Sequence, residues 1–402
     1  MLNVLLLSCE SLLFSDLTKY RIIISAGTKR GSALLFFIFF LLTAADAQLK
    51  RRMSFSNDSV FHNPLFVSDY PMADVTVFRG EDSLYYMFGS GVFNKQYLFQ
   101  SRNLYEWEST DLYPISKDVQ EGIANLKQPL EVEHPKIKSR TCLWAPHIVK
   151  VGKYYNLYTS VGSYGGIICL QSKEPTGPFE FARFDKMGNP VKLVDLRDVG
   201  MDFDVIDPCF VHDSLNKRNY LFFGSSFGIY RVELTKDGTR VKKKAKFVHV
   251  AGSTDRGKTG IDYEGTMIYK HGDYWYMILS PRRSYRLLCW RSKSLTGKFV
   301  DRNGNSPLSD KYGWEILQPQ PRNYITPEGY HLAITGHSGE IIKDKQERYY
   351  IFCHASVSLP TKTNVYGHRA ACLTEIAWDE EGWPHAVTFE HRVSYENRKP
   401  AM

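Results

Sequence analysis

The same two-strand pattern occurs five times along this chain. In each copy a hydrophobic strand is followed by a polar turn and then by an aromatic-rich strand that ends in small residues. The copies lie at residues 75–90, 146–162, 208–225, 265–281 and 339–356. They recur at intervals of roughly 60–75 residues, which indicates one structural unit used five times. Five such units arranged radially form a five-bladed β-propeller, with the innermost strands around a central axis.

Further strand pairs between the copies supply the outer strands of each blade. Two of these segments share the pattern S-K-x-x-T-G-x-F, at residues 172–179 and 292–299, which supports the duplication independently. There is no sustained amphipathic helix and no Ser/Pro-rich linker. We therefore predict an all-β fold, a single five-bladed propeller domain over residues 69–395. A charged, Pro-containing stretch at 124–140 is predicted to be a long loop over one face.

The amino-terminal region predicts export. Lys29 and Arg30 precede a short apolar run at residues 33–42, and an A-x-A sequence ends at Ala47. These features are typical of a secretory signal peptide with cleavage after Ala47, so 1–47 is predicted to be a leader. The apolar run is too short to span a bilayer comfortably, so we expect no membrane span. Residues 48–68 form a polar lead-in, and the mature protein is expected in the periplasm or outside the cell.

The charge distribution and the cysteine pattern limit which partners and metal sites we expect for this chain. The formal net charge of +8 is spread along the chain. Its densest basic cluster, at residues 242–246, is either a solvated loop or a contact for an anion, and no nucleic-acid signature accompanies it. The six cysteines after the leader lie far apart without a C-x-x-C pair, which disfavours a thiolate metal site. Buried free thiols and disulfides both remain open for an exported protein.

Three acidic residues stand at the starts of predicted innermost strands. Asp74 precedes the first copy, Asp207 the third and Glu264 the fourth. Equivalent positions in a propeller lie near the axis at the same end, so these carboxyl groups are expected to converge. Isolated acids near turns are usually turn formers or solvated charges. Repetition at one structural position favours a shared site, and three acids around one pocket indicate sugar chemistry.

The motifs around these acids resemble those of glycoside hydrolase family 43, five-bladed propeller enzymes that act on arabinose- and xylose-containing polysaccharides. The similarity spans nearly all of the mature chain. The matching segments are Ala-Asp-Val at 73–75, Ser-Arg-Asn-Leu-Tyr-Glu-Trp-Glu at 101–108, Trp-Ala-Pro at 144–146, Ile-Asp-Pro at 206–208, Glu-Gly-Thr at 264–266 and Gly-His-Ser at 336–338. The chain departs from the family pattern at Val75, where Pro is usual, and at Thr266, where Pro or Ala is usual.

The resemblance implies a role for each acid. Asp74 would be the general base, Glu264 the general acid, and Asp207 the residue that orients the acid and tunes its pKa. An inverting hydrolase needs one ionised and one protonated carboxyl group, roughly 6.5–9.5 Å apart. A neighbouring carboxylate at Asp207 would help to keep Glu264 protonated by like-charge repulsion. Asp202 and Asp204 are alternatives to Asp207, which is preferred because Pro follows it.

His337 is the candidate metal ligand. In the arabinan-cleaving branch that the chain resembles, the matching histidine lies on the axis near a largely hydrated calcium ion. A lone histidine in a core strand can instead be merely hydrogen-bonded. Since calcium prefers oxygen ligands, His337 would be one of few protein ligands, and water would supply the others.

Four further residues are candidates for substrate contact: Trp144, His147, Ser226 and Arg282. Trp144 is either a sugar platform or packing between blades, and His147 is either a sugar contact or a rim residue without a role. Ser226 lies in a segment close to the arabinan branch. Arg282, which follows the fourth copy, is a possible residue of the substrate groove.

These features predict an exported, inverting hydrolase of arabinan-type plant polysaccharide or oligosaccharide. Alternatives are an exo-acting β-xylosidase or α-L-arabinofuranosidase of the same family, and a non-catalytic carbohydrate-binding propeller. A β-fructosidase is disfavoured because the chain lacks the W-M-N-D-P-N and E-C motifs of that group. The choice between endo and exo action depends on loop shape and stays open.

Overall fold

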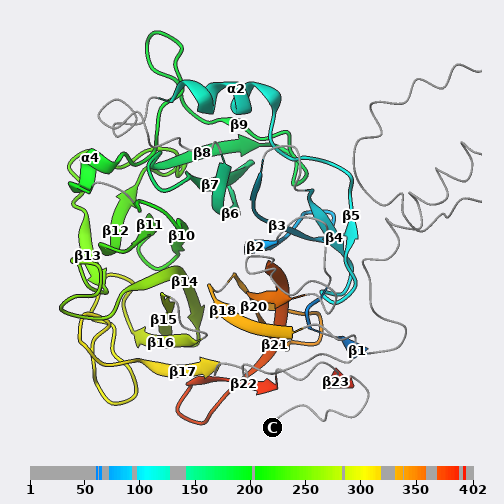
Figure 1. The fold of residues 1–402 in the computed structure, drawn as a ribbon, viewed down its shortest axis with the longest axis vertical. Coiled ribbons are helices and arrows are strands. Elements are labelled where there is room, and N and C mark those ends of the chain that lie inside the picture. The colour runs from blue at the N-terminus through cyan, green and yellow to red at the C-terminus, as the bar shows by residue number, and fades with distance from the viewer. Residues whose placement is uncertain are drawn as a thin grey trace, which may run out of the picture. The chain divides into compact units, whose positions relative to one another are not determined.

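A computed structural model of the chain describes residues 60–61, 63–65, 72–92, 97–126, 142–201, 204–282, 286–317, 331–337, 339–358, 369–388 and 393–394. The predicted leader at 1–47, the predicted cleavage site after Ala47 and most of the predicted loop at 124–140 lie outside these residues. Within them the strands form five blades around one axis (Figure 1), the first two of which are hydrogen-bonded into one sheet. This arrangement confirms the predicted single five-bladed propeller.

The blades follow one another in chain order, each with its innermost strand first. Blade 1 contains β2 (Ala73–Arg79), β3 (Tyr85–Val92), β4 (Phe99–Ser101) and β5 (Glu108–Ser109). Blade 2 contains β6 (Cys142–Val151), β7 (Tyr154–Val161), β8 (Ile167–Ser172) and β9 (Glu180–Phe181). Blade 3 contains β10 (Cys209–Asp213), β11 (Arg218–Ser225), β12 (Gly228–Leu234) and β13 (Val248–Ala251). Neighbouring strands within these blades pair antiparallel.

Blades 4 and 5 complete the ring. Blade 4 contains β14 (Tyr263–His271), β15 (Tyr274–Pro281), β16 (Leu287–Ser292) and β17 (Trp314–Leu317). In blade 5 two short strands share the innermost position and both pair with the next strand. Its strands are β18 (His331–Gly336), β19 (Ile341–Lys343), β20 (Tyr349–Ser358), β21 (Arg369–Trp378) and β22 (Pro384–Thr388).

The two ends of the propeller sequence are joined. The short strand β1 (Val60–Phe61) pairs with β23 (Val393–Ser394). Asn63, which is buried, donates from Nδ2 to the carbonyl of Leu373 and accepts from the N–H of Leu373. The segment predicted as a polar lead-in therefore contains residues that close the ring against blade 5.

Hydrophobic clusters fill the spaces between adjacent blades, because strand side chains alternate between the two faces of each sheet. On β11, Leu221 and Phe223 pack against blade 2, while Tyr220 and Phe222 pack against blade 4. All four side chains are buried. This two-sided burial explains why the second strand of each sequence copy is almost continuously apolar.

In the part of the chain that the structure describes, two helices interrupt the all-β pattern. α2 (Lys117–Asn125) was not predicted, because its single turn-spaced apolar row is too short to stand out in the sequence. Val119 and Ile123 from this row are buried against blades 1 and 2, and Ser116 caps the helix by accepting from the N–H of Val119. α4 (Leu196–Val199) is a single capped turn. No helix in the described part of the chain is long and apolar enough to cross a membrane.

Free thiols lie inside the blades. Five described cysteines are buried and carry no disulfide: Cys169, Cys209, Cys289, Cys353 and Cys372. Burial raises the pKa of the Cys169, Cys209, Cys289 and Cys353 thiols well above their ordinary value. These groups are therefore protonated packing residues at neutral pH.

Candidate active site

Each innermost strand begins with the same local irregularity. One residue per blade adopts a left-handed backbone, with φ of 48° at Asp74, 44° at Ala145, 57° at Asp207, 66° at Gly265 and 52° at His337. The antiparallel register is shifted across this position in blades 1, 2 and 4, and just before it in blade 5. Such bulges bend a strand and re-aim its side chains, and non-glycine residues adopt them at a cost of about 1–3 kcal/mol.

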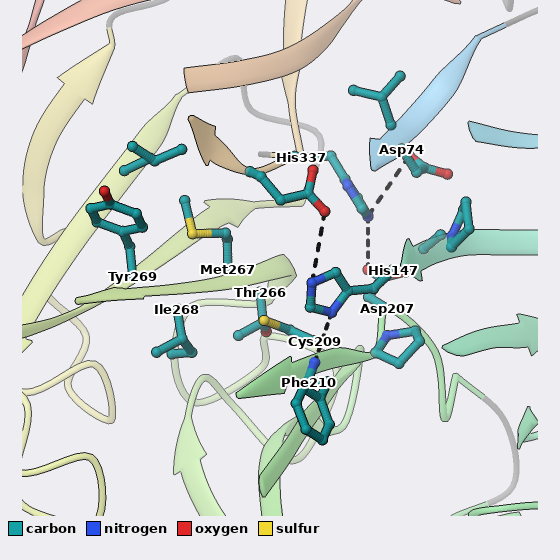
Figure 2. Close-up of a pocket in the computed structure, with 17 residues that line it drawn as sticks. Asp74, His147, Asp207, Cys209, Phe210, Thr266, Met267, Ile268, Tyr269 and His337 are labelled. Carbon is teal, nitrogen blue, oxygen red and sulfur yellow. Dashed lines mark hydrogen bonds and ion pairs between the residues drawn. The ribbon is translucent and has the colours of Figure 1, made fainter. Parts of the chain in front are cut away.

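The repeated left-handed residue brings the carboxyl groups of Asp74 and Asp207 to one histidine. His337 Nε2 lies 3.7 Å from Asp74 Oδ1 and 3.2 Å from Asp207 Oδ2 (Figure 2). Burial alone would lower the pKa of His337, but Asp74 and Asp207 raise it to about 10. Residues 263 positions apart in the chain, Asp74 and His337, thus meet on the axis.

Asp74 is held as a carboxylate. Its Oδ2 accepts a 2.5 Å hydrogen bond from Ser90 Oγ, and its backbone N–H donates to His354 Nδ1 at 3.0 Å. Arg369 Nη1 lies 3.5 Å from Oδ1. Burial alone would raise the pKa of Asp74, but His337, His354 and Arg369 together lower it well below its ordinary value. This carboxyl group is therefore ionised throughout the neutral and mildly acidic range.

Glu264 has the opposite electrostatic environment. Burial raises its pKa most, the Asp207 carboxylate raises it further, and His337 and Arg282 only partly oppose them, so the pKa is about 7. Glu264 is linked to Asp207 through the backbone, because the N–H of Gly265 donates to Asp207 Oδ2 at 3.0 Å. The two carboxyl groups that the sequence singled out as base and acid thus differ in protonation at neutral pH.

Gly265 is required by the close approach of blades 4 and 5. Its φ is positive, and a Cβ at this position would lie 2.8 Å from the Cα of His337. The glycine in the Glu-Gly-Thr segment therefore lets the chain carrying Glu264 pack directly against His337. It also shifts Glu264 by one residue relative to Asp74 and Asp207, since the left-handed position of blade 4 is Gly265.

Arg282 lies among carboxyl groups beside Glu264. Its guanidinium is 3.2 Å from Glu264 Oε2, 3.6 Å from Asp262 Oδ2 and 3.7 Å from Asp204 Oδ2. It also donates to Ser226 Oγ, which in turn donates to Asp204 Oδ2 at 2.6 Å. Two predicted contact residues, Arg282 and Ser226, are thereby brought next to the acid. Asp204 is part of this cluster, and Asp202 lies outside the described residues.

The other two predicted contact residues come from blade 2. Trp144 is partly exposed at the start of β6, and the N–H of its neighbour Ala145 donates to Ser90 Oγ, the partner of Asp74. His147 lies further along the axis. Its Nδ1 accepts from the N–H of Phe210 at 2.8 Å, and burial lowers its pKa to about 4.

A cavity of about 110 Å³ extends along the axis from Asp74 and Asp207 (Figure 2), and His147, His337 and Glu340 also line it. Glu340 accepts from Thr76 Oγ1 at 2.6 Å and from the N–H of Val77, and it lies 3.7 Å from His147 Nε2. Burial raises the pKa of Glu340 to about 8.

Sequence reasoning missed four groups of this site: Ser90, His354, Arg369 and Glu340. Glu340 and His354 belong to the fifth sequence copy, where a charged or titratable side chain interrupts apolar strands. That interruption is a usable signal, because a buried polar group needs a partner. Ser90 and Arg369 offer no such signal, since each is an ordinary polar residue at a strand end.

The residues around His337 could hold a metal ion. Asp74, His337 and His354 offer ligand atoms within 4.8 Å of one another, and neither ring nitrogen of His337 has hydrogen-bond geometry to a described residue. The Nδ1 lone pair of His354 is already used by the N–H of Asp74. The available donors are therefore the Asp74 carboxylate and the His337 imidazole, which must release the proton that its raised pKa retains before it can bind a metal. The adjoining cavity has space for water.

The family is decided by comparison with known proteins. The model of glycosyl hydrolases family 43 matches residues 61–384. The chain belongs to this family. The match covers all five left-handed positions and all three acids, so the site described above lies within the family's own domain. This family 43 enzyme is thus a glycoside hydrolase that acts on O-glycosyl bonds.

Two curated relatives and one solved structure are similar to this chain at low sequence identity. The chain is 26% identical over 255 residues to a probable arabinan endo-1,5-α-L-arabinosidase A of Aspergillus flavus, covering 60% of this chain and 72% of the relative. It is 24% identical over 262 residues to the extracellular exo-α-(1→5)-L-arabinofuranosidase ArbA of Cellvibrio japonicus, covering 60% and 69%. An endo-1,5-α-L-arabinanase structure from Thermotoga petrophila superimposes with a TM-score of 0.61 at 20% identity, covering 81% and 76%.

Proposed function

We propose that this family 43 hydrolase cleaves arabinan-type chains with inversion at the anomeric carbon, Asp74 acting as general base and Glu264 as general acid. The observation that carries the proposal is the contrast between these two carboxyl groups. Asp74 has a strongly lowered pKa, whereas the pKa of Glu264 is about 7. Single-displacement glycoside hydrolysis needs this pair of protonation states at one pH.

The reaction follows from these states. Asp74 Oδ accepts a proton from a water molecule, whose oxygen attacks the anomeric carbon from the face opposite the leaving group. Glu264 donates its proton to the glycosidic oxygen as the carbon–oxygen bond breaks. One proton leaves the water and one enters the leaving group, so Asp74 ends protonated and Glu264 ionised until solvent restores both. Positioned acid and base groups each contribute about 10²–10⁴-fold to such reactions.

Asp207 acts as a positioning residue in this scheme. Its carboxylate accepts from the N–H of Gly265, which fixes the backbone next to Glu264. Its negative charge raises the pKa of Glu264, after burial the largest contribution. Asp207 thus keeps the acid protonated without touching the reacting bond.

Substrate contacts are proposed for Trp144, His147 and Arg282, and Ser226 is proposed to support Arg282. Arg282 places hydrogen-bond donors suited to sugar hydroxyl groups beside Glu264, and Trp144 is partly exposed near Asp74. The hydroxyl group of Ser226 is buried, donates to Asp204 and accepts from Arg282, so it holds the guanidinium in place. Aromatic rings bind the apolar faces of sugars, and charged hydrogen bonds select hydroxyl positions. The relatives named above include endo- and exo-acting enzymes on α-1,5-linked arabinose, so both modes remain candidates for this chain.

Calcium is the proposed ion near His337. Asp74 supplies a carboxylate oxygen, and water in the axial cavity would supply the remaining oxygen ligands that calcium prefers. When bound, the ion would add fixed positive charge beside the carboxylates. Export through the leader at 1–47 is likewise a proposal, supported by the extracellular relatives of Cellvibrio japonicus and Bacillus subtilis.

The test is a product analysis. The purified protein is incubated with linear α-1,5-arabinan and, separately, with aryl α-L-arabinofuranoside and aryl β-xyloside, beside a Glu264→Gln variant. Mixed arabino-oligosaccharides indicate endo action, and arabinose alone indicates exo action. Release from the β-xyloside only would replace arabinan with xylosidic substrates. Binding of arabinan without any release would identify a non-catalytic binding propeller.

A further inference from the structure

A second hollow lies in blade 4 at the end remote from the acids. Strand β14 begins beside Glu264 and ends at His271, which pairs with Tyr274 at the start of β15. A strand rises about 3.3 Å per residue, so Tyr274 lies roughly 20 Å from Glu264 along the blade. Tyr274 lines a hollow of about 340 Å³ between blade 4 and the β21–β22 connection of blade 5, to which Glu381 and Trp383 contribute.

The wall of this hollow is basic. Its four cationic side chains are Arg291, Lys293, Lys298 and Arg302. Its two acids are already engaged: Asp301 accepts from the N–H groups of Asn303 and Asn305, and Glu381 Oε1 lies 2.9 Å from Arg302 Nη2. With four cations against two carboxylates, the lining carries a net positive charge.

Lys293 and Lys298 supply the positive charge that is available to a ligand in this hollow. Lys293 and Lys298 are both exposed. Across the part of the chain that the structure describes, neither ammonium group forms an ion pair. They flank the Ser-Leu-Thr-Gly turn of the second S-K-x-x-T-G-x-F segment, a motif that the catalytic site does not use. Lys293 Nζ lies 5.8 Å from the centre of the Tyr274 ring. Two ammonium groups without an ion-pair partner beside one hollow attract an anion more strongly than isolated surface lysines do.

The side chain of Arg291, which also lines the hollow, is held in place by its neighbours. The Arg291 guanidinium lies 4.1 Å from the centre of the Trp383 ring and 4.3 Å from that of Tyr274, and it also donates to the carbonyl of Glu381. Trp383 is buried, so one wall of this stack belongs to the core. A cation held in this way loses little conformational freedom when a ligand binds, which favours affinity.

We propose that this hollow, defined by Tyr274, Arg291, Lys293, Lys298, Arg302 and Trp383, binds a carboxylate-bearing sugar residue of an acidic polysaccharide. Its volume lies at the small end of ligand pockets, about 300–1,000 Å³, and thus suits a sugar ring better than a single inorganic anion. The choice of a glycan rests on the proposed function. Binding there would leave the acids at the other end free to act on neutral side chains of the same polymer, at a raised local concentration.

The test compares two charge-reversed double variants. Lys293→Glu with Lys298→Glu alters the hollow, and Lys153→Glu with Lys186→Glu makes the same change in net charge at exposed positions elsewhere. Binding is measured by calorimetry at about 0.15 M ionic strength with a galacturonate oligosaccharide, a neutral arabino-oligosaccharide, inorganic phosphate and a single-stranded DNA oligonucleotide.

The proposal predicts that the wild type binds the galacturonate oligosaccharide. The hollow variant should lose about tenfold or more of this affinity, and the control variant less than about twofold. Hydrolysis of a small aryl glycoside should be equal in all three proteins. Equal losses in both variants, tighter binding of phosphate or DNA, or no binding of the galacturonate would each overturn it. Because the readout is binding, a protein inactive on arabinan still tests the hollow.

Discussion

The guanidinium Nε of Arg282 lies 3.2 Å from Oε2 of Glu264, so the proposed general acid is in contact with a cation. Two nearby charges therefore act on Glu264 in opposite directions. Arg282 lowers its pKa and Asp207 raises it. Because an acid catalyst works only while protonated, both residues should set the pH above which activity is lost.

Replacing Arg282 with Gln should move the alkaline limb of the kcat–pH profile upward. Loss of the cation removes a stabilising partner of the Glu264 anion, so the pKa rises from about 7, by up to about one unit. The matched control is Arg286→Gln, because Arg286 pairs with Glu315 instead. An Arg282 variant whose alkaline limb stays in place or moves to lower pH would contradict this electrostatic role.

Replacing Asp207 with Asn should shift the same limb in the other direction. The amide keeps an oxygen for the N–H of Gly265 but removes the negative charge that raises the pKa of Glu264. Activity should then decline at a lower pH than in the wild type, where the decline is centred near 7. The profile is measured on an aryl glycoside. An unchanged limb would mean that Asp207 acts only through backbone geometry.

Glu340 should contribute to stability in a pH-dependent way. Glu340→Ala removes the acceptor of Thr76 Oγ1 and of the N–H of Val77, and an unpaired buried donor costs about 1–3 kcal/mol. The Tm of the wild type should exceed that of the Glu340→Ala variant most strongly at pH values below the ordinary glutamate pKa. This difference in Tm should shrink as the pH rises towards about 8, because the buried carboxyl group must then ionise.

The control for this stability measurement is Glu347→Ala. Glu347 is exposed in the turn before β20 and pairs only with the neighbouring Lys343 among described residues, so its removal should change the free energy of unfolding by less than about 0.5 kcal/mol. A Glu340→Ala protein with wild-type Tm at every pH would show that the contacts of Glu340 contribute nothing.

Elemental analysis and chelation test for the calcium ion that is proposed near His337. After dialysis without chelator, elemental analysis of the wild type should find calcium, and chelation should lower Tm because the bound ion stabilises only the folded state. His337→Ala should purify without the ion, whereas His385→Ala, on the outer strand β22, should retain it. A wild type free of metal, or a His337 variant that keeps it, excludes this site.

The sequence predicted the blades because each copy carries its own signal. Alternation, polar turns and aromatic second strands are local features, and five repetitions are sufficient to define a propeller. Helix α2 was missed because its apolar row spans only three residues: Val119, Ile123 and Leu126. The pairing of β1 with β23 joins segments too short and too distant for any local pattern to reveal.

The site was predictable where its residues repeat a structural position. Asp74, Asp207 and His337 each occupy the left-handed residue at the axial end of their blades. Glu264 lies one residue earlier, since the position itself must be Gly265. Arg369 and His354, which help to set the protonation state of Asp74, lie more than 250 residues from it in the sequence. Only the closed ring of blades brings them to Asp74, so the sequence alone does not reveal these contacts.

The most direct test of the catalytic account is the anomeric configuration of the first product. Proton NMR follows linear α-1,5-arabinan during the first minutes of reaction, before mutarotation mixes the anomers. An Asp74 base and a Glu264 acid predict that the new reducing end appears first as the β-anomer, and that neither Asp74→Asn nor Glu264→Gln releases it. Initial release of the α-anomer, or undiminished release by either variant, would contradict the proposed mechanism.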